Sequence, residues 1–126
     1  MADAESIVRE FCAAWSGLDA DELTSRFTED AVYHNIPMEP LKGHEAIRGF
    51  LAGFLAAVTF AEFECKNVVS DGDTVMTERI DHFELNGKRA GFPVMGIFEL
   101  RAGKIAAWRD YFDMAQVTAF LTGSAT

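Results

Sequence analysis

An arginine and an aspartate stand two residues apart in the stretch TERIDHF, which covers residues 77–83. Side chains of a β-strand alternate between its two faces, so a strand here places Arg79, Asp81 and Phe83 on one face. Phe83 indicates that this face looks into the core. Charged side chains are seldom buried unless they are paired, so the pair is either a structural salt bridge or part of a site.

The same period places further hydrogen-bonding groups on apolar faces. In KIAAWRDYF, Asp110 shares its face with Trp108 and Phe112, and in AVYHN, Tyr33 shares its face with Asn35. An apolar sheet face that carries two carboxylates, an arginine, a tyrosine and an amide is typical of a small-molecule site.

The chemistry open to such residues is acid and base catalysis. The sequence shows no Ser-His-Asp set, thiolate-histidine pair, glycine-rich phosphate loop or metal-ligand spacing, so it gives no support to covalent, phosphoryl-transfer or metal mechanisms. Two carboxylates beside one arginine in an apolar pocket tend to share a proton, so that one donates while the other accepts. We therefore expect neither a metal nor a cofactor.

Helices and strands are predicted from apolar spacing and turn residues. Asp19 and Asp113 read as N-caps, each with Glu or Gln three residues later. Helices are expected near 7–15, 19–27, 44–58 and 113–121, and strands near 31–35, 59–69, 74–85, 89–101 and 104–112.

These elements predict an α+β fold in which about four helices cover one face of a curved, largely antiparallel sheet. The last four strands, joined by short turns, read as an antiparallel meander. In the strand that begins near residue 59, one face is expected to carry Ala61, Phe63, Cys65, Asn67 and Val69.

Length and composition limit the classes of function. The 126 residues are expected to form one domain, 1–126, and the net charge of −9 argues against a nucleic-acid partner. No apolar run approaches the roughly 20 residues of a membrane span. The first residues do not read as a secretory signal, which predicts a cytoplasmic location, and Cys12 and Cys65 read as reduced core residues.

Three segments, VYHNIP, TERIDHF and GKIAAWRDYFD, together resemble the limonene-1,2-epoxide hydrolase family. The resemblance runs from the first helix to about Phe120. It implies the cone-shaped α+β fold shared by nuclear-transport-factor-like and ketosteroid-isomerase-like proteins, a homodimer, and hydrolysis of an epoxide to a vicinal diol in one step.

The resemblance also implies a role for each polar residue. Asp110 corresponds to the general base that activates water, and Tyr33 and Asn35 to the groups that hold that water. Asp81 corresponds to the acid that protonates the epoxide oxygen, and Arg79 to the bridge between the two carboxylates.

The lining of the pocket is predicted from the strand and helix periods. Its expected members, which ordinary core packing also explains, are Trp15, Phe54, Phe63, Phe83, Phe92, Val94 and Phe112. So many phenylalanines favour a hydrophobic cyclic or aryl epoxide. Two alternatives stay open: an isomerase or dehydratase that acts beside a carbonyl, and a non-catalytic binding module on the same fold.

Overall fold

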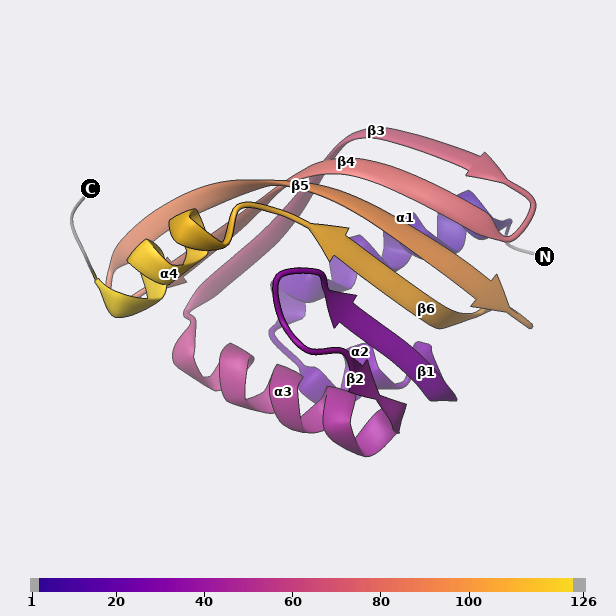
Figure 1. Ribbon diagram of the computed structural model, residues 1–126, viewed down its shortest axis with the longest axis horizontal. Helices are drawn as coiled ribbons and strands as arrows, with labels where there is room; N and C mark the ends of the chain where they lie inside the picture. Colours follow the sequence, from indigo (N-terminus) through magenta and orange to yellow (C-terminus); the bar gives the residue numbers. More distant parts are fainter. Residues whose placement is uncertain (1–2, 124–126) are drawn as a thin grey trace.

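The computed structural model describes residues 3–123 (Figure 1). A curved sheet of six strands carries the helices on one of its faces, as the sequence predicts. The elements in chain order are α1 (Ala4–Ala14), the 3-10 turn η1 (Trp15–Gly17), α2 (Ala20–Thr24), β1 (Phe27–Asn35), β2 (Leu41–Lys42), α3 (Gly43–Ala57), β3 (Phe60–Asp71), β4 (Thr74–Leu85), β5 (Lys88–Arg101), β6 (Lys104–Tyr111) and α4 (Met114–Thr122).

Aspartate side chains start three of the helices. Asp3 Oδ1 accepts a hydrogen bond from the backbone N–H of Ser6 at the start of α1 (2.8 Å). Asp19 caps α2 and Asp113 caps α4 in the same manner, as the sequence predicts. Each carboxylate satisfies an N–H that has no partner inside its helix, at the end where the helix dipole is positive.

The strand order across the sheet is β2-β1-β6-β5-β4-β3. Strands β3 to β6 form the predicted antiparallel meander, and β1 joins it by pairing in parallel with β6. The turn between β4 and β5 holds Asn86 and Gly87 at φ 53° and φ 76°. Positive φ at both central residues suits the right-handed twist of a two-residue hairpin, which asparagine and glycine allow.

One predicted strand face is wrong beyond Cys65. A β-bulge between Cys65 and Asn67 inserts Lys66 as an extra residue opposite β4. An inserted residue reverses the faces that follow it. Val69 is consequently 63% exposed, whereas Val68 packs against the core.

The segment between β1 and α3 contains an element that the sequence does not predict. The two residues of β2 pair antiparallel with β1, Leu41 opposite Tyr33. A two-residue strand is too short to show a period in the sequence.

The core lies between the helices and the concave face of the sheet, and its centre is aromatic. Trp108 is fully buried, stacks on Tyr33 (ring centroids 4.2 Å apart) and on Phe98 (5.1 Å), and meets the edge of Phe11. Such ring pairs contribute about 0.5–1.5 kcal/mol each beyond the burial of their area. The stacked rings form the floor beneath the polar residues.

Candidate active site

The charged residues of β4 and β6 face the core, as strand alternation predicts. Arg79 is 0% exposed, Asp81 5% and Asp110 3%. Asp110 lies on β6 and the other two on β4, with β5 between the two strands. The pairing of both strands with β5 therefore brings together carboxylates that are far apart in the chain.

Arg79 is held by five hydrogen bonds. Nε and Nη2 donate to the two oxygens of Asp81 (2.9 and 2.8 Å), and Nη1 and Nη2 donate to the two oxygens of Asp110 (3.2 and 2.7 Å). The remaining N–H of Nη1 donates to Oγ1 of Thr77 (3.0 Å). Since a guanidinium has five N–H donors, every donor is satisfied and both carboxylates are bound in a bidentate manner.

Two further contacts of this cluster were missed by the sequence analysis. Trp108 Nε1 donates to Asp110 Oδ1 (2.6 Å), and Thr77 is the hydroxyl that accepts from Arg79. Each residue stands two positions before a charged partner on the same strand face. That spacing is the signal that could have identified both.

Gly96 of β5 leaves the room that the cluster occupies. It lies opposite Thr77 on β4 and opposite Asp110 on β6. A Cβ atom at this position would collide with Arg79 Nη1 and with Asp110 Oδ1. Glycine is therefore required here by close approach of side chains and not by its φ angle.

Burial determines the protonation of the cluster. Burial raises the pKa of Asp81 to about 6. The Arg79 guanidinium acts in the opposite direction and lowers this pKa, whereas the charge of Asp110 raises it further. Burial disfavours the charged form of Arg79, but Asp110 and Asp81 outweigh it and hold the arginine pKa well above its usual value. Asp81 can thus carry a proton near neutral pH beside a permanently charged arginine.

The parallel pairing of β1 with β6 brings the other predicted residues to this cluster. Asn35 lies opposite Asp110, and Tyr33 lies opposite Trp108. Burial raises the pKa of Tyr33 well above its usual value, so its hydroxyl stays protonated. A hydroxyl and an amide therefore stand beside one carboxylate of the pair.

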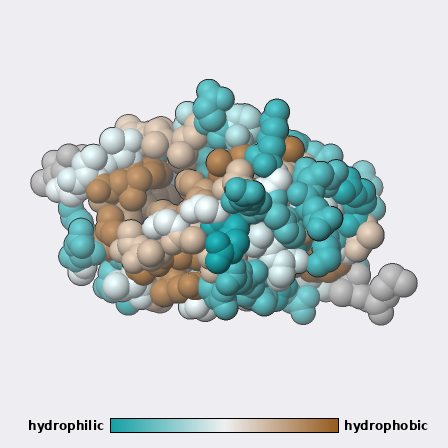
Figure 2. Space-filling view, turned by 90° about the horizontal axis from the view of Figure 1, so that it is seen from below, coloured by the Kyte–Doolittle hydropathy of each residue, from teal (hydrophilic) through white to brown (hydrophobic). Residues whose placement is uncertain are grey.

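A cavity of about 140 Å³ lies over this cluster, and Asp81, Asp110, Tyr33 and Asn35 line it together with apolar residues. Arg79 lies behind the two carboxylates and is not part of the lining. All seven residues predicted to line the pocket do so: Trp15, Phe54, Phe63, Phe83, Phe92, Val94 and Phe112. Figure 2 shows a hollow rimmed by hydrophobic residues on the left of the view.

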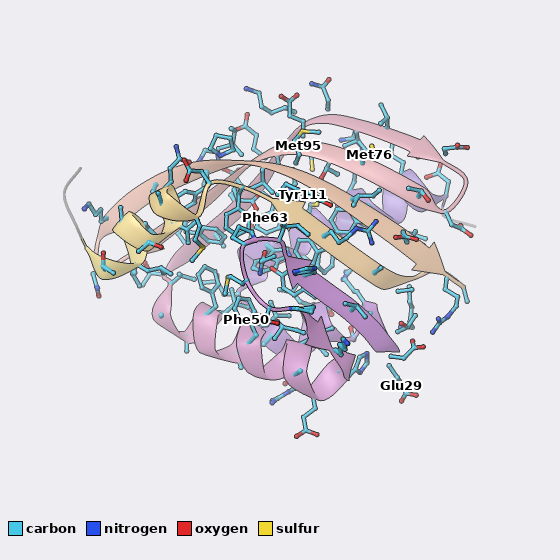
Figure 3. The ribbon with its side chains drawn as sticks, viewed as in Figure 1. Glu29, Phe50, Phe63, Met76, Met95 and Tyr111 are labelled. Carbon is cyan, nitrogen blue, oxygen red and sulfur yellow. The ribbon has the colours of Figure 1, made fainter. Side chains whose placement is uncertain are left out.

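Five apolar residues of the lining were missed: Met38, Phe50, Met114, Val117 and Leu121. Three of them belong to α4, which the sequence predicts as a helix without indicating where it packs. Figure 3 shows Phe50 and Phe63 beneath the sheet, whereas Met76 and Met95 lie on its outer face.

Residues 3–123 contain no group of three or more His, Cys, Asp or Glu side chains placed to hold a metal ion. The predicted independence of metals and cofactors stays a prediction. In the same part of the chain, no helix is long and apolar enough to cross a membrane.

Known proteins share both the sequence pattern and the fold. Residues 8–108 match the SnoaL-like domain family. Over 107 residues the chain is 33% identical to epoxide hydrolase EphG of Mycobacterium tuberculosis. The aligned region covers 85% of this chain and 71% of that protein. A solved LEH-like epoxide hydrolase of M. tuberculosis is similar with a TM-score of 0.81 and 30% identity, over 95% of this chain and 90% of that chain.

A protein with a ketosteroid isomerase-like fold from Catenulispora acidiphila is similar in structure alone. Its TM-score is 0.80 at 24% identity, over 90% of each chain. The predicted resemblance to limonene-1,2-epoxide hydrolases and the predicted cone-shaped α+β fold are thus confirmed.

Proposed function

The chain belongs to the SnoaL-like domain family, and we propose that it is an epoxide hydrolase of the limonene-1,2-epoxide hydrolase type. The proposed reaction adds water to a hydrophobic cyclic or aryl epoxide and yields a vicinal diol. The observation that carries the proposal is the pair of carboxylates, both bound by one buried arginine and both lining an apolar cavity. Similarity to proteins named epoxide hydrolases supports the same reaction.

Asp110 is the proposed general base. Its carboxylate lines the cavity, and Trp108 and Arg79 fix its orientation from behind. A water molecule bound between Asp110, Tyr33 and Asn35 would lose a proton to Asp110 as its oxygen attacks an epoxide carbon. Such positioned proton transfer accelerates reactions by about 10²- to 10⁴-fold.

Asp81 is the proposed general acid. Its pKa of about 6 lets a useful fraction of the carboxyl keep its proton at neutral pH. The proton would pass to the epoxide oxygen while the C–O bond breaks, so no alkoxide forms in the apolar pocket. Water attack and ring opening then occur in one step, without a covalent enzyme intermediate.

Arg79 is the proposed positioning group for both carboxylates. Its planar guanidinium binds each of them with two hydrogen bonds, which a lysine ammonium cannot reproduce. One positive charge compensates one carboxylate, so the second is more stable as the neutral acid. The cluster thereby supplies one base and one acid from two residues of the same type.

The lining of the cavity supports a hydrophobic substrate. Apart from Tyr33, Asn35, Asp81 and Asp110, all of the lining residues are apolar. An epoxide oxygen can therefore meet its polar partners only at the floor, while the hydrocarbon part contacts aromatic rings and methionines. A metal or cofactor has no part in this proposal.

The experiment that tests the proposal is a turnover assay with limonene oxide, cyclohexene oxide and styrene oxide, with diols resolved by chiral chromatography. We expect an enantiomerically enriched diol from at least one of them, and none above the uncatalysed rate with folded Asp110→Asn. A protein that is stabilised against heat by these epoxides and converts none would be a binding module. Turnover of carbonyl substrates instead would indicate the isomerase or dehydratase alternative.

We further propose that the chain is one domain that works as a homodimer in the cytoplasm. The outer face of the sheet supports the dimer, because Met76 and Met95 on this face are 47% and 52% exposed. Exposed apolar groups that gather in a patch are typical of an interaction surface.

A further inference from the structure

The two cysteines lie on facing elements and take no part in the proposed reaction. Cys12 is on the buried side of α1 and is 1% exposed, and Cys65 is on β3, against which α1 packs. Both are free, and each thiol shifts the pKa of the other. Neither lines the cavity.

Cys65 is the accessible member of this pair. It is half-buried, and β3 is the outermost strand on its side of the sheet. The bulge at Lys66 follows directly and interrupts the pairing with β4. A small oxidant can therefore reach Cys65 from the sheet edge, whereas Cys12 is only 1% exposed.

The surroundings make Cys65 the nucleophile. The neighbouring Cys12 thiol lowers the pKa of the Cys65 thiol to about 7, the charges of Arg79 and Arg9 lower it further, and burial opposes them. The neighbouring Cys65 thiol and burial raise the pKa of Cys12 well above its usual value. Because the thiolate is the reactive form, Cys65 attacks and Cys12 stays a thiol.

We propose that Cys12 and Cys65 form an oxidation site, in which a peroxide converts the pair to a reversible disulfide that ties α1 to β3. Because α1 packs on β3 at this level, the two sulfurs can approach to the S–S length of about 2.0 Å without unfolding of either element. Disulfides in the cytoplasm are usually transient, so a pair that is reduced at rest and oxidised for a limited time fits the proposed location.

The reaction has two steps. The Cys65 thiolate attacks one peroxide oxygen, the O–O bond breaks, the thiol becomes a sulfenic acid, and the released hydroxide takes up a proton to give water. The Cys12 sulfur then attacks the Cys65 sulfur, the S–O bond breaks, and the hydroxyl group leaves as water with the Cys12 proton. Two thiols are oxidised by two electrons in all, and hydrogen peroxide is reduced to two waters.

The bond would fix one wall of the cavity. Cys12 stands three residues before Trp15 and Cys65 two residues after Phe63, and the rings of Trp15 and Phe63 stack with centroids 4.4 Å apart. Cys65 also lies directly opposite Arg79 in the β3–β4 ladder. A cross-link here holds α1 against the strand pair that carries the charged cluster.

The test treats the full chain with hydrogen peroxide at pH 7 and follows intact mass, peptide maps and amide hydrogen exchange, before and after dithiothreitol. We expect a loss of two hydrogen atoms, a Cys12–Cys65 cross-linked peptide, and slower exchange in α1 that returns after reduction. Cys12→Ser should stop at a sulfenic acid on Cys65 that dimedone traps. In Cys65→Ser the remaining thiol, Cys12, is buried and protonated. Its oxidation should be at least roughly tenfold slower than the oxidation of Cys65 in Cys12→Ser.

Circular dichroism of both serine variants confirms that they are folded. A wild-type chain whose Cys65 passes to sulfinic acid without forming the cross-link overturns the proposal. Equal oxidation rates of the two serine variants, or unchanged exchange in α1 after cross-linking, overturn it as well. None of these measurements depends on epoxide turnover.

Discussion

Arg79 uses all five of its N–H donors on three side chains, Thr77, Asp81 and Asp110. Stability alone does not explain such an arrangement, since a buried ion pair is often no more stabilising than apolar residues of the same volume. Breaking it is costly, because a buried charge loses its partner. The acid and base roles proposed for its two carboxylates at the floor of the cavity would explain the cluster.

The two aspartates should act as one unit. Asp81→Asn and Asp110→Asn are each expected to lower kcat on a good epoxide by about 10²- to 10⁴-fold, the usual worth of a general acid or base. The double variant should be scarcely slower than the slower single variant, because both groups act in one step. Near wild-type rates in the two folded single variants would leave a structural salt bridge as the better explanation.

The pH dependence of kcat/KM should report the protonation of Asp81. Its pKa is raised in the folded protein, so its protonated form, which the proposal needs, is lost as pH rises through about 6. We expect kcat/KM to fall above about pH 6, and to do so about tenfold per pH unit at higher pH. A kcat/KM that rises across pH 6 to 8 would contradict the role of Asp81.

The same shift affects stability. Because the folded pKa of Asp81 lies above its unfolded value, its contribution to the free energy of unfolding is complete below about pH 4 and is lost as pH rises through about 6. Asp81→Asn keeps a neutral side chain at every pH, so urea unfolding of this variant should lose that part of the pH dependence.

Gly96 should not tolerate a methyl group. In Gly96→Ala the new Cβ displaces Arg79 Nη1 and Asp110 Oδ1 and should cost about 1–3 kcal/mol of unfolding free energy, with a large loss of kcat. Gly53→Ala is the matched control, because Gly53 lies exposed in α3 with nothing near its Cβ position. Equal behaviour of the two variants in urea unfolding and turnover would refute the steric argument.

At the scale of the elements, α4 closes the cavity with Met114, Val117 and Leu121. The helix is short and its start depends on the Asp113 cap. Part of the cavity lining therefore belongs to an element that has few other contacts with the sheet. Local opening of such an element costs less than global unfolding.

Removal of that cap should affect substrate binding more than chemistry. Asp113→Ala is expected to destabilise α4 by about 1 kcal/mol and to raise KM several-fold, with a smaller change in kcat. Asp19→Ala removes the equivalent cap from α2, whose residues do not line the cavity, and should leave KM unchanged. Steady-state kinetics on both variants distinguish a role in the site from a general loss of stability.

At the scale of the whole molecule, the two faces of the sheet carry different kinds of side chain. The concave face holds the cluster and the cavity, and the outer face exposes Met76, Met95 and Tyr111. Met95 and Tyr111 are register partners on β5 and β6, so they lie side by side. The exposed apolar side chains on this face mark the surface on which the proposed homodimer would form.

Charge on the outer face should separate the dimer. Met95→Asp is expected to shift the mass measured by light scattering from dimer to monomer, since an unpaired carboxylate would be buried in the interface. Met38→Asp places the same charge at another exposed methionine, which lines the cavity, and should leave the mass unchanged. A monomeric wild-type chain, or a dimer that survives Met95→Asp, would contradict the interface.

Much of the site follows from the sequence, because side-chain alternation is a local property of a strand. The inward direction of Arg79, Asp81 and Asp110, and of every predicted lining residue on β3 to β6, could be read from the period alone. The catalytic roles of these residues stay predictions, since geometry does not measure turnover.

Tertiary structure decided what depends on contacts between distant segments. The parallel pairing that sets Asn35 opposite Asp110, the bulge at Lys66 that reverses the end of β3, and the packing of α4 over the cavity have no local period. The proximity of Cys12 to Cys65 belongs to the same class. Strand partners, bulges and helix docking are determined by which distant surfaces bury best against one another, and local spacing along the chain carries no measure of that.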